Sequence, residues 1–252
     1  MSTNKNTSMN KHITVACFGA SITAAVGSFK WIDELEKRPQ NKRFRFVNLG
    51  VGGDPAYAGL KRLPKVVATH PDVVIVAFGW NDIVTLLFKN ARRFIGGWKG
   101  VSHEPTPEWF RENLQTIVRE LQEQTSAKIA LSSLSEMGED PDSTDPVQRE
   151  LNKRFKQYSK IIKEIAEEEK VYYIPLYERM HEQIVASPGR AFTAFRFRTM
   201  YHDAFRQYIQ RQSLDKMAKI NRWQFHVDGL HLNSRGGMIL ANLVQEFLDE
   251  QQ

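Results

Sequence analysis

The sequence has a single cysteine and no long apolar run, and each of these absences excludes a class of protein. Cys17 is the one cysteine among 252 residues, so an internal disulfide is excluded, and its apolar surroundings predict a buried, unreactive thiol. No stretch approaches the roughly 20 apolar residues that a membrane-spanning helix needs. The polar N-terminal stretch MSTNKNTSMNKH does not have the pattern of a secretory signal. We therefore expect a cytoplasmic protein without a transmembrane segment and with a disordered tail at residues 1–11.

An excess of basic charge is also missing from most of the chain. The net charge is +6, and residues 188–226 alone carry eight Lys and Arg residues against two Asp residues. The rest of the chain is therefore neutral overall, which argues against a nucleic-acid-binding protein. Three interpretations of this segment stay open: a basic helical insertion packed on the sheet edge, a lid that selects an anionic or extended substrate, or a membrane-surface element.

Five short apolar runs predict strands that are buried on both faces, as in a parallel sheet covered by helices. These runs are residues 13–18, 44–49, 72–78, 128–134 and 171–175. Helical patterns alternate with them at residues 31–37, 55–68, 107–123, 145–165 and 236–248, and Asp145 is the predicted N-cap of the fourth. Alternating strands and helices imply right-handed crossovers. The pattern therefore predicts an α/β fold with three layers, in a single domain over residues 12–252.

Polar groups follow the first three predicted strands. Ser21 lies just past the first strand, Gly53 past the second and Asn81 past the third. In an open parallel sheet, the active crevice lies outside these carboxyl ends. Late in the chain, the stretch VDGLHLNSRGG supplies Asp228 and His231. The topology is thus expected to bring a hydroxyl, glycine-rich backbone, a carboxamide and an Asp-x-x-His pair to one edge.

These groups are the residue types that acyl transfer needs. A serine hydroxyl is a weak nucleophile unless a base takes its proton, and His231 is the candidate base for Ser21. Asp228, three residues earlier, can bind the other imidazole nitrogen and stabilise the imidazolium. The attacked carbonyl becomes an oxyanion, which needs fixed donors. The candidate donors are the backbone N–H groups of Ser21 and Gly53 and the side-chain amide of Asn81.

Four sequence blocks, taken in order, resemble the SGNH superfamily of GDSL-type esterases and lipases. They are GASIT around Ser21, NLGVGGD around Gly53, GWND around Asn81, and DGLH with Asp228 and His231. The resemblance covers nearly the whole chain. It implies a three-layer α/β/α sandwich with a parallel, flavodoxin-like five-stranded sheet, and a serine hydrolase without a cofactor. It also implies Ser21 as nucleophile, Gly53 and Asn81 in the oxyanion hole, and Asp228 and His231 as orienter and base.

Two positions depart from the pattern of that family. Ala20 stands where the family usually has an aspartate before the serine. Since this position supplies no proton-transfer or oxyanion group, we expect changed loop packing rather than lost activity. Trp80 stands where the family usually has the second glycine of Gly-Gly-Asn-Asp. An indole there is expected to reshape the acyl side of the pocket, so Trp80 is a predicted substrate-binding residue.

The same stretches argue against other kinds of site. His226, Asp228 and His231 have no further ligand cluster beside them, so we predict no metal. The GVGG stretch at residues 50–53 lacks the dinucleotide fingerprint and the P-loop ending, so we predict no nucleotide cofactor. The GASIT stretch is also not the Gly-x-Ser-x-Gly nucleophile elbow of α/β-hydrolases, because Thr23 stands at the position of the last glycine.

We therefore predict a serine hydrolase that cleaves small or medium acyl esters through an acyl-enzyme, with a small-molecule ester as its partner. By analogy with the family, a carbohydrate or metabolite O-deacetylase is the favoured variant. The alternatives are an acyltransferase that uses the same triad and a non-catalytic binding module on this scaffold. The GGWKG stretch before Pro105 is a candidate mobile rim. The sequence makes no prediction of oligomeric state.

Overall fold

Five parallel strands form the central sheet of the computed structural model, which describes residues 12–99, 105–195, 202–203 and 205–251. They are β1 (Ile13–Gly19), β2 (Phe44–Gly50), β3 (Val73–Ala77), β4 (Lys128–Ser132) and β5 (Tyr172–Ile174). Their order across the sheet is β2-β1-β3-β4-β5, and every neighbouring pair is parallel. The predicted parallel five-stranded sheet is confirmed.

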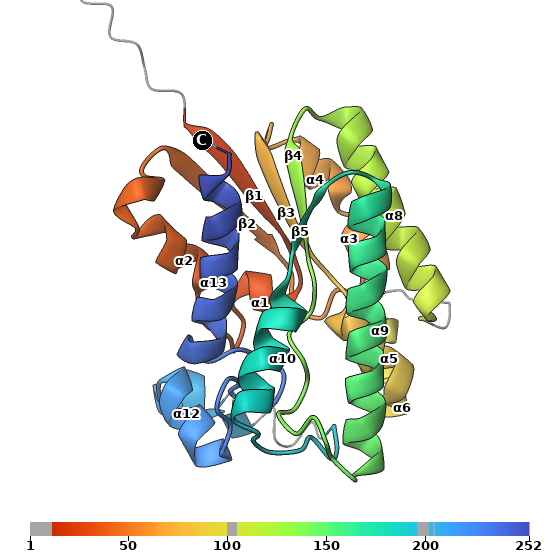
Figure 1. The fold of residues 1–252 in the computed structure, drawn as a ribbon, viewed down its shortest axis with the longest axis vertical. Coiled ribbons are helices and arrows are strands. Elements are labelled where there is room, and N and C mark those ends of the chain that lie inside the picture. The colour runs from red at the N-terminus through yellow and green to blue at the C-terminus, as the bar shows by residue number, and fades with distance from the viewer. Residues whose placement is uncertain (1–11, 100–104, 196–201, 204, 252) are drawn as a thin grey trace, which may run out of the picture.

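Helices cover both faces of this sheet (Figure 1). On one face lie α2 (Trp31–Glu36) and α13 (Ser234–Asp249), which contact each other. The other face carries α3 (Ala56–Leu60), α4 (Leu63–Val67), α8 (Pro107–Gln124) and α9 (Pro146–Glu168). Two further helices, α10 (Leu176–Ala186) and α12 (Leu214–Asn221), lie toward the end where the strands finish. This arrangement is the three-layer α/β/α sandwich that the sequence predicts.

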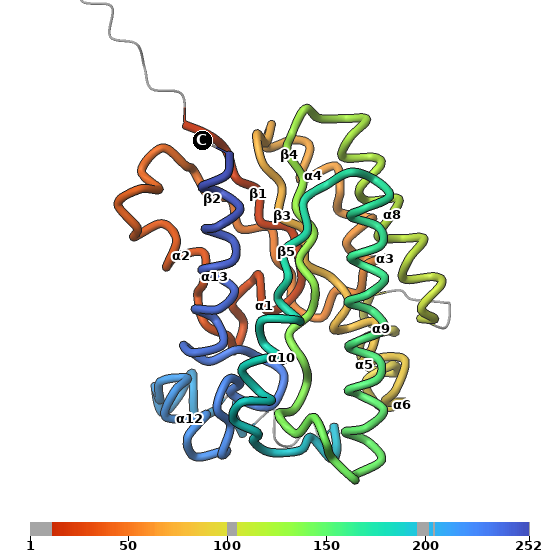
Figure 2. Tube along the Cα trace, in the orientation of Figure 1, coloured from red at the N-terminus to blue at the C-terminus, as the bar shows by residue number. Residues whose placement is uncertain are grey.

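The strand register aligns the carboxyl ends of three strands. Gly19, the last residue of β1, pairs with Gly50 of β2 and with Ala77 of β3. Residues that follow these strands therefore emerge at one edge of the sheet. The chain trace in Figure 2 shows that the segment before α13 returns to this edge near α1 (Ser21–Ala24). Behind the edge, Cys17 is fully buried in the core, and burial raises the pKa of its thiol.

Helix boundaries follow local chemistry, with one difference from prediction. α9 begins as predicted, because the Asp145 carboxylate accepts hydrogen bonds from the N–H groups of Val147 and Gln148 at 2.8 and 3.2 Å. The predicted helix over 55–68 is instead divided into α3 and α4. Pro64 lies in the first turn of α4 and has no N–H to donate to the preceding turn, so the helix is interrupted.

A chain of short helices follows β3. It consists of α5 (Trp80–Leu87), α6 (Lys89–Ala91), a π-helix (Arg92–Gly96) and α7 (Gly97–Lys99). We call residues 89–99 the rim segment. A 3₁₀ turn (Pro39–Asn41) precedes β2. None of the helices in the described ranges combines the length and the apolar character needed to span a bilayer.

The basic segment 188–226 is helical only in part. It contains a π-helix (Phe205–Ile209) and α12, whereas residues 188–195 are irregular. Arg196 and Arg198, and the predicted tail at residues 1–11, lie outside the described residues. The predicted single domain with an insertion or lid therefore stays a prediction.

Candidate active site

Ser21 is the first residue of α1, directly beyond the carboxyl end of β1. α1 packs on the end of β2, where a Cβ at Gly50 would overlap with the backbone of Ala24. Glycine at position 50 thus permits a close approach that any larger residue would prevent. This packing fixes the turn that carries Ser21. The Ala20 side chain, one residue earlier, is buried in the core.

A tight loop holds Asp228 and His231. An antiparallel bridge between His226 and Leu232 closes this loop. Within it, Oδ1 of Asp228 accepts hydrogen bonds from the backbone N–H groups of Leu230 at 3.0 Å and His231 at 2.8 Å. An aspartate that binds the backbone two and three residues ahead stabilises such a turn. The Asp-x-x-His spacing therefore fixes both side chains relative to each other.

The structure brings Ser21, His231 and Asp228 into one hydrogen-bonded row. Oγ of Ser21 lies 3.0 Å from Nε2 of His231. On the other side of the ring, Nδ1 of His231 lies 2.8 Å from Oδ2 of Asp228. The side chains of His231 and Asp228 are 14% and 19% exposed, so the row is reached from solvent only at its edge. Its geometry is that of a nucleophile, a base and an orienting carboxylate.

The charges in this row stabilise each other. Burial alone would raise the pKa of Asp228, but the charge and hydrogen bond of His231 and two backbone N–H groups lower it to about 2. Burial alone would lower the pKa of His231, but the neighbouring Asp228 carboxylate raises it above its usual value. Asp228 is therefore ionised at neutral pH, and it favours the protonated form of the imidazole.

Two further predicted residues line the same cavity as Ser21, namely Gly53 and Asn81. Gly53 lies in the loop after β2 with a φ of +78°, a conformation that favours glycine. Nδ2 of Asn81 donates a hydrogen bond to the carbonyl oxygen of Asp54 at 3.1 Å. A carboxamide nitrogen carries two hydrogens, so the same group can also donate to a ligand in the cavity.

The cavity beside Ser21 and His231 has a volume of about 580 Å³. Its walls come from the rim segment, from residues 190–195 and from loops that follow the strands. The apolar lining consists of Val26, Val51, Val84, Phe94, Ile95, Trp98, Met137, Ala191, Phe192, Ala194, Phe195, Trp223 and Leu230. Pockets of roughly 300–1,000 Å³ accommodate small organic ligands. The cavity is thus much larger than a two-carbon acyl group requires.

Trp80 does not line this cavity, in contrast to the sequence-based expectation. It is the first residue of α5, and its side chain is only 3% exposed. Its indole nitrogen donates hydrogen bonds to the backbone oxygen and the hydroxyl of Ser135 at 3.0 and 3.1 Å. The ring is part of the hydrophobic core, and these hydrogen bonds satisfy its buried N–H. Trp98 of the rim segment is the tryptophan from this region that lines the cavity.

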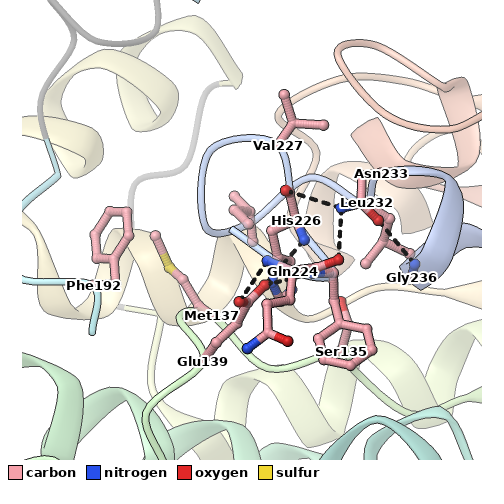
Figure 3. A network of polar contacts seen from close by, with 12 residues as sticks. Ser135, Met137, Glu139, Phe192, Gln224, His226, Val227, Leu232, Asn233 and Gly236 are labelled. Carbon is pink, nitrogen blue, oxygen red and sulfur yellow. Dashed lines mark hydrogen bonds and ion pairs between the residues drawn. The ribbon is translucent and has the colours of Figure 1, made fainter. Parts of the chain in front are cut away.

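Glu139, beyond the end of β4, anchors the loop that carries Asp228 (Figure 3). Its side chain is fully buried, and Oε1 lies 2.9 Å from Nδ1 of His226. The same carboxylate accepts hydrogen bonds from the backbone N–H groups of Gln224, Phe225 and His226. Burial would raise the pKa of Glu139, but these donors lower it overall. One carboxylate therefore fixes the start of the loop.

Glu139 is not among the site residues predicted from the sequence. It lies in the stretch SEMGED, which follows the fourth predicted strand much as Ser21 follows the first. This position beyond the carboxyl end of a predicted strand is the feature that could have marked Glu139 as a site residue. Gly138, one residue earlier, adds a second connection, since its N–H donates to the carbonyl oxygen of Gly229 at 2.8 Å.

Replacing Glu139 with alanine is expected to lower the free energy of unfolding by about 3–5 kcal/mol, because a buried histidine and three backbone N–H groups lose their acceptor. Urea unfolding followed by circular dichroism measures this loss. Glu150→Ala removes a partly exposed partner of Arg154 on α9 and is the control, with a loss below about 1 kcal/mol. Equal losses in the two variants would contradict the anchoring role of Glu139.

A second carboxylate–imidazole pair lies nearby. Oε1 of Glu136 is 3.1 Å from Nδ1 of His181. Burial raises the pKa of Glu136, although the charges of His181 and His226 oppose that effect. Within the described ranges, the His, Cys, Asp and Glu side chains form no group of three or more that would hold a metal ion.

The chain also matches a known protein family. Residues 17–237 match the GDSL-like Lipase/Acylhydrolase family. The chain belongs to this family. The matched range includes Ser21, Gly53, Asn81 and the Asp-x-x-His pair. The family resemblance that the four sequence blocks predict is therefore confirmed.

One curated relative in sequence is the esterase TesA of Pseudomonas aeruginosa. The two proteins are 37% identical over 75 residues, which is 27% of this chain. The matched part spans 37% of the length of that relative, well under two thirds.

Similar solved structures cover nearly the whole chain. An acetylxylan esterase from Geobacillus stearothermophilus has a TM-score of 0.63 and 18% identity, over 94% of this chain and 95% of its own. A lipase/acylhydrolase from Enterococcus faecalis has a TM-score of 0.60 and 20% identity, over 95% and 96% of the two chains. At these identities the likeness concerns the fold, and it agrees with the three-layer sandwich.

Proposed function

We propose that this chain is a serine esterase that hydrolyses small-molecule acyl esters through an acyl-enzyme. The observation that carries the proposal is the hydrogen-bonded row of three side chains. Oγ of Ser21 lies 3.0 Å from Nε2 of His231, and Nδ1 of the same ring lies 2.8 Å from Asp228. Membership of a lipase/acylhydrolase family supports it.

In the first half-reaction, Oγ of Ser21 attacks the carbonyl carbon of the ester while Nε2 of His231 takes its proton. The carbonyl oxygen becomes an oxyanion that accepts hydrogen bonds from the backbone N–H groups of Ser21 and Gly53 and from the amide of Asn81. The bond to the leaving alcohol then breaks, and His231 returns its proton to that alcohol. Asp228 stabilises the imidazolium throughout.

In the second half-reaction, water replaces the alcohol. His231 takes a proton from the attacking water, whose oxygen bonds to the acyl carbon. The bond between that carbon and Oγ of Ser21 breaks, and the imidazolium returns the proton to Oγ. The products are the carboxylic acid and the free enzyme. Deprotonated His231 is required at the start of each half-reaction, so activity depends on the pKa of this residue.

The apolar cavity supports a medium-length acyl group as the preferred substrate. Its lining includes Phe94, Trp98 and Phe192, and its volume of about 580 Å³ exceeds what an acetyl group fills. Each CH₂ group buried in such a cavity contributes about 0.8 kcal/mol. The solved neighbours that are named acetylxylan esterases make an O-deacetylase the second candidate.

A panel of p-nitrophenyl esters from acetate to decanoate tests activity and acyl length together. We expect kcat/KM to rise at least about tenfold from acetate to hexanoate, because the added CH₂ groups leave water for the cavity. Ala194→Phe, which adds a ring to the cavity lining, is expected to reduce hydrolysis of hexanoate more than that of acetate. Val185→Phe, at a 52% exposed position of α10, is the matched control.

Three outcomes of this panel are distinct. A rate that falls steadily from acetate onward would favour the O-deacetylase, and acetylated oligosaccharides would then be the next substrates. Equal effects of the two phenylalanine variants would show that the cavity does not determine the preference for acyl length. No hydrolysis of any ester would contradict the proposed function.

A further inference from the structure

Asp54 is the centre of a buried ion cluster next to the predicted oxyanion donor Gly53. Its side chain is 2% exposed. Nζ of Lys99 lies 2.6 Å from Oδ1 of Asp54, and Nε of Arg62 lies 2.7 Å from Oδ2. Each carboxylate oxygen thus has its own cation, and the two cations come from different parts of the fold. We call Asp54, Arg62 and Lys99 the Asp54 cluster.

Arg62 alone is sufficient to balance the charge of Asp54 and to fix it to the sheet. Its guanidinium also donates hydrogen bonds to the carbonyl oxygen of Leu49 at 3.0 Å and that of Gly19 at 3.3 Å. Arg62 therefore connects Asp54 to the ends of β1 and β2. Lys99 leaves the cluster with one positive charge in excess, although its side chain is only 11% exposed. Because burying a charge is unfavourable, charge balance does not explain Lys99.

Lys99 instead connects two separate walls of the site. It is the last residue of α7 in the rim segment, and its Cε would lie 3.6 Å from a Cβ placed on Gly53. The ring of its neighbour Trp98 would lie 3.5 Å from the same point. The ammonium group also lies 4.0 Å from the centre of the Trp98 ring, within the range of a cation–π interaction. The rim segment thus packs directly against residues 51–55, the loop after β2 that contains Gly53 and Asp54.

Two contacts of this loop come from α5. Asn81 donates to the carbonyl oxygen of Asp54, and the Asp82 carboxylate accepts from the N–H of Ala56 at 3.1 Å. Both residues belong to α5, which is fixed to the end of β3. These contacts hold the loop to the sheet. The ion pair of Lys99 connects it to the rim segment, beside the packing of the Trp98 ring.

We propose that Lys99 is a positioning residue whose ion pair with Asp54 holds the N–H of Gly53 in the geometry that the oxyanion requires. The same pair fixes the ring of Trp98 as a wall of the cavity. Transition-state stabilisation therefore depends on the rim segment being in place. This inference rests on the proposed esterase function and adds to it a residue outside the catalytic row.

Lys99→Met tests the proposal with two independent readouts. Removing a whole oxyanion donor lowers turnover about 10²–10³-fold, so a displaced donor is expected to lower kcat about tenfold. The substrate is p-nitrophenyl acetate, whose acyl group is too short to need the Trp98 wall, and KM for it is expected to change little. Amide hydrogen exchange of the peptide that contains Gly53 is expected to become faster. That second readout does not require activity.

Three variants separate positioning from other effects. Lys99→Arg keeps a cation for Asp54 and is expected to restore most of kcat. Lys89→Met removes the same charge from an exposed position of the rim segment and is expected to behave as the wild type. Trp98→Ala removes the ring but keeps the ion pair of Lys99 with Asp54, and it is expected to raise KM for hexanoate. If Lys99→Met does not fold, Lys99→Gln takes its place, with a smaller loss of kcat and the same change in exchange.

Unchanged kcat and unchanged exchange in Lys99→Met would overturn the proposal, and so would a Lys99→Arg variant as slow as Lys99→Met. Labelling of the wild type by a fluorophosphonate at Ser21 distinguishes this failure from failure of the proposed function. If the wild type is labelled but Lys99→Met has unchanged kcat and exchange, only the positioning role is refuted. An unlabelled wild type refutes the esterase, and the exchange readout still decides whether Lys99 holds the loop.

Discussion

Ser21→Ala is expected to lower ester hydrolysis by about 10⁴-fold or more, since a triad that loses its nucleophile retains only the catalysis supplied by binding and the oxyanion donors. The variant loses one hydrogen bond, that between Oγ and Nε2 of His231. A single bond of this kind contributes about 1 kcal/mol to stability, so the fold is expected to persist. Initial rates with p-nitrophenyl hexanoate and thermal unfolding measure the two effects.

The matched control is Ser28→Ala, which removes a buried hydroxyl beside the same loop but outside the catalytic row. Ser28→Ala is expected to unfold at a lower temperature than the wild type but to keep its rate of ester hydrolysis. A fluorophosphonate reagent is expected to label the wild type and Ser28→Ala, but not Ser21→Ala. Wild-type turnover in Ser21→Ala would show that another residue is the nucleophile.

Asp228→Asn is expected to reduce kcat about 10⁴-fold, because an amide no longer stabilises the imidazolium or selects the tautomer of His231. A second effect appears in the pH profile. The wild type is active with neutral His231, whose pKa Asp228 raises, so activity falls as pH decreases through that raised pKa. Without the carboxylate, the imidazolium is less stable and its pKa falls. The acidic limb of kcat/KM is therefore expected to move to lower pH in the variant.

Residual activity of Asp228→Asn, measured from pH 4 to 9 with the ester well below its KM, provides this kcat/KM profile. Asp145→Asn is the control, since the Asp145 carboxylate caps α9 through the N–H groups of Val147 and Gln148 and asparagine also caps helices. Its profile is expected to match that of the wild type. An acidic limb that stays in place in Asp228→Asn would contradict the role of Asp228 in setting the pKa of His231.

The fold and the family were predictable because their signals are local. Apolar runs mark the strands, and in a parallel sheet the residues that follow them must meet at one edge. The Asp-x-x-His spacing likewise encodes a turn, since Asp228 binds the backbone N–H of His231 within the same loop. A single sequence is therefore sufficient to place Ser21, Gly53, Asn81, Asp228 and His231 together.

Contacts between distant side chains were not predictable in the same way. The direction of the Trp80 ring depends on Ser135, a partner 55 positions away in the sequence. Glu139 and His226 are 87 positions apart, and Lys99 reaches Asp54 from a different part of the chain. No periodicity or spacing records such pairs. They depend on how the loops pack once the sheet has formed.

The basic segment 188–226 lies between these two cases. Its composition marked it as unusual, and Phe192 and Phe195 do line the cavity. Composition does not specify a conformation, however: residues 188–195 are irregular, whereas α12 of the same segment is helical. The role of the segment as a lid stays a prediction.

The buried position of Cys17 has a practical consequence for spectroscopy. Since this thiol is unreachable and the chain has no other, the native protein offers no background to maleimide reagents. A cysteine introduced at an exposed site would then be the one point of attachment for a dye or a spin label. Probe pairs for measuring motion of individual loops can be installed without first removing any natural residue.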